Sequence, residues 1–167
     1  ALRESRSRIV AMSEIHELMY RHDSSKTIAF HDYLASLVER MERSFGRLQG
    51  INFRFESREV EVMFDQAIPL GLIINELLTN AVKYAFTEEQ ANPQVAITVT
   101  VDDGWTLMVT DNGVGIADDG ELETSDSLGM TIIHALTDQL GGHVTFHNRP
   151  EIDVGLRVTL HIPLLSA

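Results

Sequence analysis

The sequence predicts a mixed α+β fold, because its 167 residues contain two different hydrophobic periodicities. Between positions 70 and 85 the apolar residues recur every three or four positions, which is the spacing of a helix with one buried face. Between positions 95 and 110, apolar and polar residues alternate on both sides of an Asp-Asp-Gly turn, which is typical of a β-hairpin. Helices and strands are therefore expected within one chain.

The first 22 residues are predicted to form one helix. Two rows of residues spaced by seven run along it, with Leu2, Ile9 and His16 in one row and Met12 and Met19 in the other. Such a seam is short for a free coiled coil but adequate for one leg of a helical bundle. Segment 23–27 is expected to be a linker, and residues 28–167 a separate domain.

The remaining elements follow from the same two patterns. Helices are predicted over 28–48, over the segment around 70–85 with Pro69 in its first turn, and over 128–140, where two glycines end the helix. The predicted strands lie at 51–55, 60–62, 95–101, 106–110, 143–147 and 156–162.

Composition limits the function classes. An apolar content of 44% is enough for a sizeable core, and a net charge of −12 disfavours a nucleic-acid partner. The chain has no cysteine, which excludes a disulfide scaffold and fits a reducing compartment. No apolar run is long enough for a membrane span, so a cytoplasmic domain is expected. The chain begins in mid-pattern, which suggests a fragment, and a longer parent protein is compatible with a membrane anchor.

Polar residues share one side of the predicted helix around 70–85. Glu76, Asn80 and Lys83 are separated by four and then three positions, so they lie on one face, opposite the apolar stripe. A carboxylate, an amide oxygen and an ammonium in a row can hold a metal ion and a phosphate chain. Mg²⁺ takes oxygen ligands and usually shares them with nucleotide phosphates.

A second motif, Asp111-Asn112-Gly113-Val114-Gly115, ends the predicted hairpin. An acidic residue at the end of a strand is followed by two glycines, which allow a tight turn and a close approach of backbone to a ligand. An ordinary Asp-Asn-Gly turn would have the same residues. The combination of both motifs in this order is more specific than either motif alone.

The two motifs resemble the ATP-binding domain of the GHKL superfamily, which includes gyrase, the Hsp90 chaperones, histidine kinases and MutL. The ending Asn80-Ala81-Val82-Lys83-Tyr84 is similar to that of the histidine kinases. The resemblance covers roughly residues 28–163. It implies a two-layer α/β sandwich, in which a mixed, mostly antiparallel sheet packs on helices and ATP lies between the two motifs.

The resemblance also implies roles for individual residues. Asn80 would be a Mg²⁺ ligand, Lys83 and Tyr84 would approach the phosphates and the nucleotide, and Asp111 would accept a hydrogen bond from the adenine amino group. Glu76 stands where related ATPases have a catalytic base and many histidine kinases have asparagine. The other implied nucleotide-binding residues are Gly113, Gly115, Leu128, Gly129 and Met130.

Residues 116–127 contain five acidic residues and no basic one. By the resemblance this segment is the lid over the nucleotide, and an ordinary solvated acidic loop would have the same composition. Ser127 stands where the family usually has glycine, which puts the geometry of the lid in question. Gly129, at the start of the next helix, can still present backbone N–H groups to a phosphate.

The segment Ile15-His16-Glu17 is similar to the start of the phosphoacceptor segment in many histidine kinases. His16 lies on the heptad seam, however, and we expect it to face a bundle core. The stretch from Arg8 to Leu37 resembles instead the second helix and connector of the HWE-like class of histidine kinases. In that class the acceptor histidine lies on the preceding helix, so we expect no phosphoacceptor in this chain.

Together with the resemblance, these observations predict that the chain is the ATP-binding catalytic part of a sensor histidine kinase. It would use ATP and Mg²⁺ to phosphorylate a histidine on a helix absent from this chain, from which a response regulator takes the phosphate. The full-length protein would be a homodimer. One alternative is an anti-sigma-factor-like serine kinase of the same superfamily. Another is a non-catalytic nucleotide-binding module.

Overall fold

The computed structural model describes residues 2–21, 27–46, 49–102, 104–116, 127–149 and 155–163. Its helices are α1 (Leu2–Arg21), α2 (Phe30–Met41), which continues as a π-helical turn (Glu42–Gly46), α4 (Phe64–Tyr84) and α6 (Leu128–Gln139). Its strands are β1 (Thr27–Ala29), β2 (Asn52–Ser57), β3 (Glu61–Met63), β4 (Gln94–Val101), β5 (Gly104–Asp111), β6 (His143–Asn148) and β7 (Leu156–Pro163).

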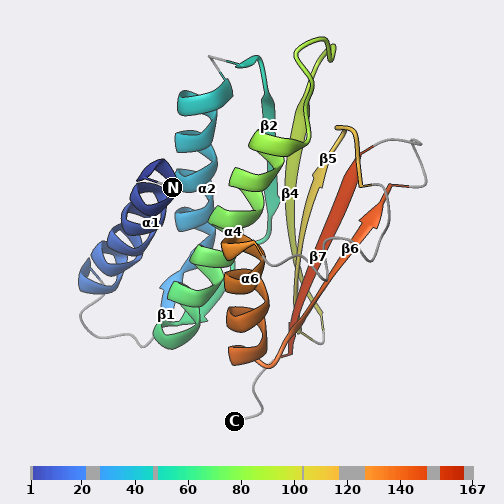
Figure 1. Cartoon of the computed structure of the whole chain (residues 1–167). Coiled ribbons are helices and arrows are strands. Elements are labelled where there is room, and N and C mark those ends of the chain that lie inside the picture. The colour runs from blue at the N-terminus through green and yellow to red at the C-terminus, as the bar shows by residue number, and fades with distance from the viewer. Residues whose placement is uncertain are drawn as a thin grey trace.

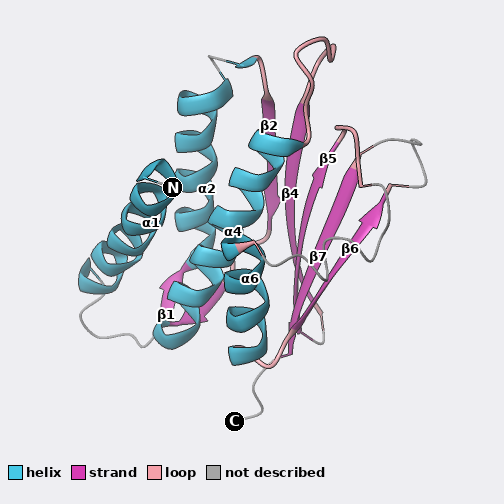
Figure 2. Ribbon diagram, in the orientation of Figure 1, coloured by secondary structure: helices cyan, strands magenta, loops and turns pink. Residues whose placement is uncertain are grey.

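Within these residues, one sheet of five strands has the order β2-β4-β5-β7-β6. Only β2 and β4 pair in parallel, and the three other pairs are antiparallel. Helices α2, α4 and α6 lie side by side on one face of this sheet (Figures 1 and 2). The predicted two-layer sandwich with a mixed, mostly antiparallel sheet is therefore confirmed.

The core lies between the helix layer and the sheet. Ile73, Ile74 and Leu78 of α4 are completely buried, and every second residue of β4 from Val95 to Val99 is buried as well. Periods of 3.6 in the helix and 2 in the strand bring these apolar residues to the same interface. The central helix α4 is thereby fixed against the sheet along its length.

The N-terminal helix α1 lies outside the layer formed by α2, α4 and α6, and it packs chiefly against α4 (Figure 1). Ala11 and Ile15 are the described side chains that α1 buries completely. The predicted heptad seam is not on the buried side of α1, since Ile9 is 63% exposed and Met12 and His16 are also exposed. Within this chain, His16 therefore does not face a core.

Two predicted elements differ from the structure. Ile28 was expected in a helix but belongs to β1, where it pairs with Val62 of β3. A partner so distant in sequence leaves no trace in local periodicity.

Helix α4 begins at Phe64, so Pro69 lies beyond its first turn. This proline has no N–H, so one hydrogen bond within the helix is not made.

No helix among the described residues is long and apolar enough to cross a bilayer. The predicted linker 23–27 lies outside the described residues except for Thr27, which begins β1. Most of the predicted acidic lid, residues 117–126, also lies outside them.

Candidate functional site

A cavity of about 500 Å³ opens between α4, the start of α6 and the sheet. Nine of the ten residues predicted to bind the nucleotide or act in catalysis line it. These nine are Glu76, Asn80, Lys83, Tyr84, Asp111, Gly115, Leu128, Gly129 and Met130. The two sequence motifs thus meet at one cavity, although the cavity by itself does not establish their chemical roles.

The polar residues of α4 enter the cavity at different depths. Glu76 is only 4% exposed, Asn80 is half-buried, and Lys83 and Tyr84 at the end of the helix are exposed. Successive polar residues of this face lie about one helical turn apart, and their side chains are more exposed toward the C-terminal end of α4. The ammonium group therefore belongs to the open rim and the carboxylate to the interior.

Asp111 ends β5 and is nearly fully buried. Its Oδ1 accepts hydrogen bonds from the backbone N–H of Gly113 at 2.8 Å and of Leu156 at 3.2 Å. Burial raises the pKa of the carboxyl group, and these two hydrogen bonds and the charge of Arg149 oppose the rise. Both bonds use Oδ1, which leaves Oδ2 as an acceptor for a ligand.

Gly113 does not line the cavity but fixes the turn that carries Asp111. A Cβ atom at this position would lie 2.1 Å from the carbonyl oxygen of Ala85, just past the end of α4. The neighbouring Val114 N–H donates to that same oxygen at 2.8 Å. The absent side chain therefore allows the strand end and the helix end to meet.

Gly115 has a positive φ of 71°, which glycine adopts without strain. A Cβ atom there would lie 2.4 Å from Oδ1 of Asn148. The Asn148 side chain binds both backbone groups of Ile116, accepting from its N–H at 2.8 Å and donating to its C=O at 2.7 Å. The chain is thus anchored to β6 where the predicted lid begins.

Ser127 is the N-cap of α6. Its Oγ accepts a hydrogen bond from the Met130 N–H at 3.3 Å. Serine is favoured at this position because its side chain satisfies an N–H group that has no partner within the helix. The departure from the usual glycine thus has a local structural role, and Gly129 still lies at the cavity.

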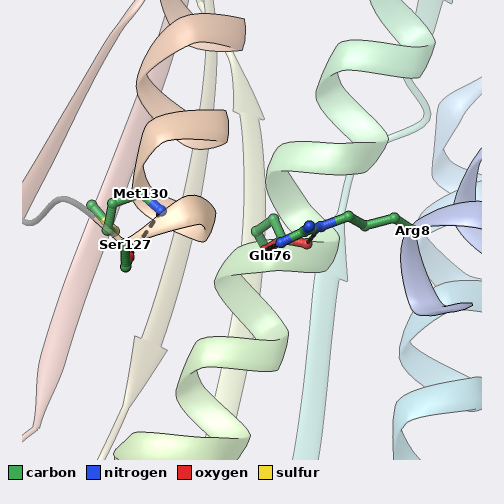
Figure 3. Close-up of polar contacts among 4 residues, drawn as sticks. All are labelled: Arg8, Glu76, Ser127 and Met130. Carbon is green, nitrogen blue, oxygen red and sulfur yellow. Dashed lines mark hydrogen bonds and ion pairs between the residues drawn. The ribbon is translucent and has the colours of Figure 1, made fainter. Parts of the chain in front are cut away.

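Arg8 is a cavity residue that the sequence analysis did not single out. Its side chain extends from α1 to Glu76 on α4, on the side of Glu76 opposite the start of α6 (Figure 3). The guanidinium donates through Nε to Oε1 at 2.8 Å and through Nη2 to Oε2 at 2.9 Å. The pair spans 68 positions in the sequence, and no local motif indicated it.

Thr79 was also missed, although it lies within the first motif. It lines the cavity, and its buried Oγ1 has no hydrogen-bond partner among the described residues. The apolar wall of the cavity comes from the sheet and includes Val109, Phe146 and Val158. A cavity with an apolar wall and a few polar groups is typical of a small-molecule site.

Two protein-family models match this chain. The model described as "Histidine kinase-, DNA gyrase B-, and HSP90-like ATPase" matches residues 65–166, which hold both motifs. The chain belongs to this family. A second model, described as "Histidine kinase", matches residues 1–45. The predicted resemblance to the histidine kinases of the GHKL superfamily is therefore confirmed, and ATP is the ligand that this family implies.

Individual relatives agree with this assignment. "Blue-light-activated histidine kinase 2" of Erythrobacter litoralis is 30% identical over 84% of this chain and 40% of that protein. "Sensor histidine kinase PdtaS" of Mycobacterium tuberculosis is 36% identical over 56% of this chain and 20% of that protein. The chain thus spans less than half the length of either relative.

A solved structure shares the whole architecture. The histidine kinase domain of a blue-light-activated histidine kinase from Erythrobacter litoralis superposes with a TM-score of 0.85 at 25% identity. The match covers 96% of this chain and 75% of that structure. It includes α1 together with the sheet and its helices, since so little of the chain lies outside it.

Proposed function

We propose that this chain is the ATP-binding catalytic part of a two-component sensor histidine kinase. It would transfer the γ-phosphoryl group of ATP to a histidine on a helix outside this chain. The observation that carries the proposal is the convergence of Asp111 and the polar face of α4 on one cavity, within a chain that matches histidine kinase models over both of its segments.

The β5 end of the cavity suits the adenine base. Asp111 is held rigidly by two backbone N–H groups and keeps one carboxylate oxygen for the exocyclic amino group. The buried Thr79 Oγ1 lacks a partner among the described residues, and a polar atom of the ligand would satisfy it. The apolar wall around Val158 would cover the faces of the base.

The other end suits a magnesium-bound phosphate chain. Asn80 lines the cavity with an amide oxygen, and Mg²⁺ commonly takes one or two protein oxygens together with phosphates and water. A Cβ atom at Gly129 would lie 3.8 Å from both terminal atoms of the Asn80 amide, so its absence leaves space there. Lys83 at the rim supplies positive charge.

In the proposed reaction, the bond between the γ-phosphorus and the bridging oxygen breaks and a bond to the acceptor imidazole nitrogen forms. ADP leaves with the bridging oxygen, and Mg²⁺ would neutralise charge on the phosphates. This chemistry asks mainly for positioning and charge stabilisation. Accordingly, Asp111 and Thr79 orient the nucleotide, while Asn80 and Lys83 hold the phosphate chain. Glu76 is a candidate base for the proton that the acceptor imidazole loses.

The N-terminal segment 1–22 is proposed to be the second helix of a dimerisation and phosphoacceptor hairpin, with residues 28–167 as the catalytic domain. Ile9, Met12 and His16 form an exposed row on α1, as a helix that awaits a bundle partner would have. The partners would be a second copy of the full-length protein and a response regulator, whose aspartate receives the phosphate.

Titration with ATP in Mg²⁺ by calorimetry is the first test. We expect saturable binding with one nucleotide per chain. The same titration with the Asn80→Ala variant should show weaker binding chiefly when Mg²⁺ is present. An equal loss with and without the metal would contradict the ligand role of Asn80. The absence of binding by the unmodified chain would contradict the proposed nucleotide site itself, whereas binding without phosphoryl transfer would favour the non-catalytic nucleotide-binding module.

Phosphoryl transfer is tested separately by supplying the missing helix in trans. A peptide or domain carrying the first helix of a related hairpin is incubated with the chain and radiolabelled ATP. Acid-labile label on that helix supports a histidine kinase. Acid-stable label on a protein substrate would support the serine kinase alternative instead.

A further inference from the structure

The contact between Arg8 and Glu76 joins two parts of the chain that match different family models. Arg8 lies in the segment 1–45, and Glu76 lies in the segment 65–166. Both residues line the cavity, and they form a two-pronged ion pair with distances of 2.8 and 2.9 Å (Figure 3). A planar guanidinium that binds both oxygens of a carboxylate fixes its orientation as well as its charge.

We propose that Arg8 is a positioning residue of the nucleotide site, which neutralises and orients the Glu76 carboxylate so that the cavity accepts a phosphate chain. This inference rests on the proposed binding of ATP. It means that the ATP site extends beyond the catalytic domain. Its phosphate end is complete only when α1 is docked.

The charges around the cavity explain why a neutralising partner is needed. Among the described side chains that line it, Glu76 and Asp111 are acidic, and Arg8 and Lys83 are basic. Lys83 is exposed at the rim, whereas Glu76 is buried. A buried carboxylate without a cation would repel the phosphates more strongly than an exposed one, because little water screens it. The net charge of −12 on the whole chain adds to this repulsion.

The Glu76 carboxylate lies close to the N-terminal turn of α6, so its charge can act on bound phosphates at short distance. A Cβ atom at Gly129, at the start of α6, would lie 3.1 Å from Oε2 of Glu76. The N-terminal turn of α6 is the place where backbone N–H groups can bind a phosphate. The carboxylate therefore borders the space that the phosphates would occupy, and its charge and orientation affect their binding.

A second ion pair of α1 provides a matched control. Arg40 of α2 pairs with Glu14 of α1, and neither residue lines the cavity. Replacing Arg40 with glutamine removes one ion pair between α1 and α2, while the packing of α1 on α4 and the charge next to Glu76 remain in place. The two arginine substitutions thus separate a local electrostatic effect from a general loosening of the helix.

The experiment is a double-mutant cycle on ATP affinity, measured in Mg²⁺ by calorimetry with the whole chain. The variants are Arg8→Gln, Glu76→Gln and the double variant, with Arg40→Gln as the control. We expect Arg8→Gln to weaken ATP binding by at least about tenfold, which is the size of effect produced by one uncompensated charge a few ångströms away. In the Glu76→Gln background the same substitution should have a much smaller effect. Arg40→Gln should stay within about twofold of the unmodified chain.

Rescue by a conservative substitution completes the test. Arg8→Lys retains the charge but cannot bind both carboxylate oxygens, so its affinity should lie between those of the unmodified chain and Arg8→Gln. Circular dichroism and thermal unfolding of each variant establish that it is folded under the conditions of the titration.

The outcomes are distinct. Unchanged or tighter binding by Arg8→Gln would overturn the inference, and tighter binding would mean that the pair obstructs the site. An equal loss in both Glu76 backgrounds would also overturn it, because Arg8 would then act on the phosphates without Glu76. An equal loss of ATP affinity in Arg40→Gln would overturn the inference as well, because Arg8 would then act only by holding α1 in place. If the unmodified chain bound no ATP, this result would contradict the proposed function, whereas the outcomes above contradict only the role of Arg8.

Discussion

Asp111 is held by the Gly113 N–H two positions away, whereas Glu76 at the other end of the cavity is held by Arg8, 68 positions away. The β5 end is built on the sheet and its turn, where the Leu156 N–H of the paired strand β7 also donates to Asp111. The α6 end is assembled from three helices that the chain brings together only on folding. The first end should therefore tolerate changes in the docking of α1, and the second should respond to them.

The largest expected effect is at the β5 end, with Gly113→Ala. The new Cβ atom would lie 2.1 Å from the Ala85 carbonyl oxygen, so the strand end and the α4 end must separate. We expect a loss of about 3 kcal/mol in the free energy of unfolding, measured by urea denaturation. Val114→Ala in the same turn, where the side chain is 59% exposed, should cost less than about 0.5 kcal/mol. Similar small costs for both would mean that the turn is adaptable and not a rigid frame.

Asp111→Ala should leave the fold in place and weaken ATP binding. A hydrogen bond to a charged group contributes roughly 1.5–3 kcal/mol, which corresponds to about a 10- to 150-fold change in affinity. Calorimetric titration measures it directly. Glu88→Ala, on the exposed segment after α4, changes one acidic residue away from the cavity and serves as the control. An unchanged affinity in Asp111→Ala would show that the adenine is recognised elsewhere.

The pH dependence of ATP binding tests the same carboxyl group without replacing the residue. Burial raises the pKa of Asp111, so acidification protonates it at a higher pH than an ordinary aspartate. We expect ATP affinity to fall by roughly tenfold as this group is protonated, and Asp111→Asn should lack that component of the pH profile. Because the pKa is higher in the folded chain than in the unfolded chain, protonation of Asp111 adds stability as the pH falls. Identical pH profiles for both proteins would rule out this titration as a factor in binding.

The smallest effect is expected at the other end, at the start of α6. Ser127→Ala removes the acceptor for the Met130 N–H and should lower the free energy of unfolding by about 0.5–1 kcal/mol. Ser127→Gly, which restores the residue usual in the family, should cost only a few tenths of a kcal/mol. Thermal unfolding distinguishes the two variants. A greater loss in the glycine variant would show that the serine acts other than as a cap.

The sequence predicted most of the fold because most elements carry their own pattern. Alternation located β4 and β5 to within two residues of the observed bounds, and apolar spacing located α4, although this helix begins about six residues before the predicted start. Ile28 was assigned to the wrong kind of element, because β1 is defined by its pairing with β3 and not by any periodicity of its own. The row through Ile9 and His16 was predicted to face a bundle core, and within this chain it is exposed. Its packing in a bundle stays a prediction.

The candidate site likewise has parts that the sequence predicted and parts that it did not. The motifs within residues 76–84 and 111–115 could be predicted from the sequence, since the spacing along one helix and the chemistry of one turn are local properties, and most of their polar residues line the cavity. Only the tertiary structure decided that Arg8 neutralises Glu76 and that Ser127 caps α6 beside them. An ion pair between two helices depends on how those helices pack, and packing is a property of the whole chain that no short segment encodes.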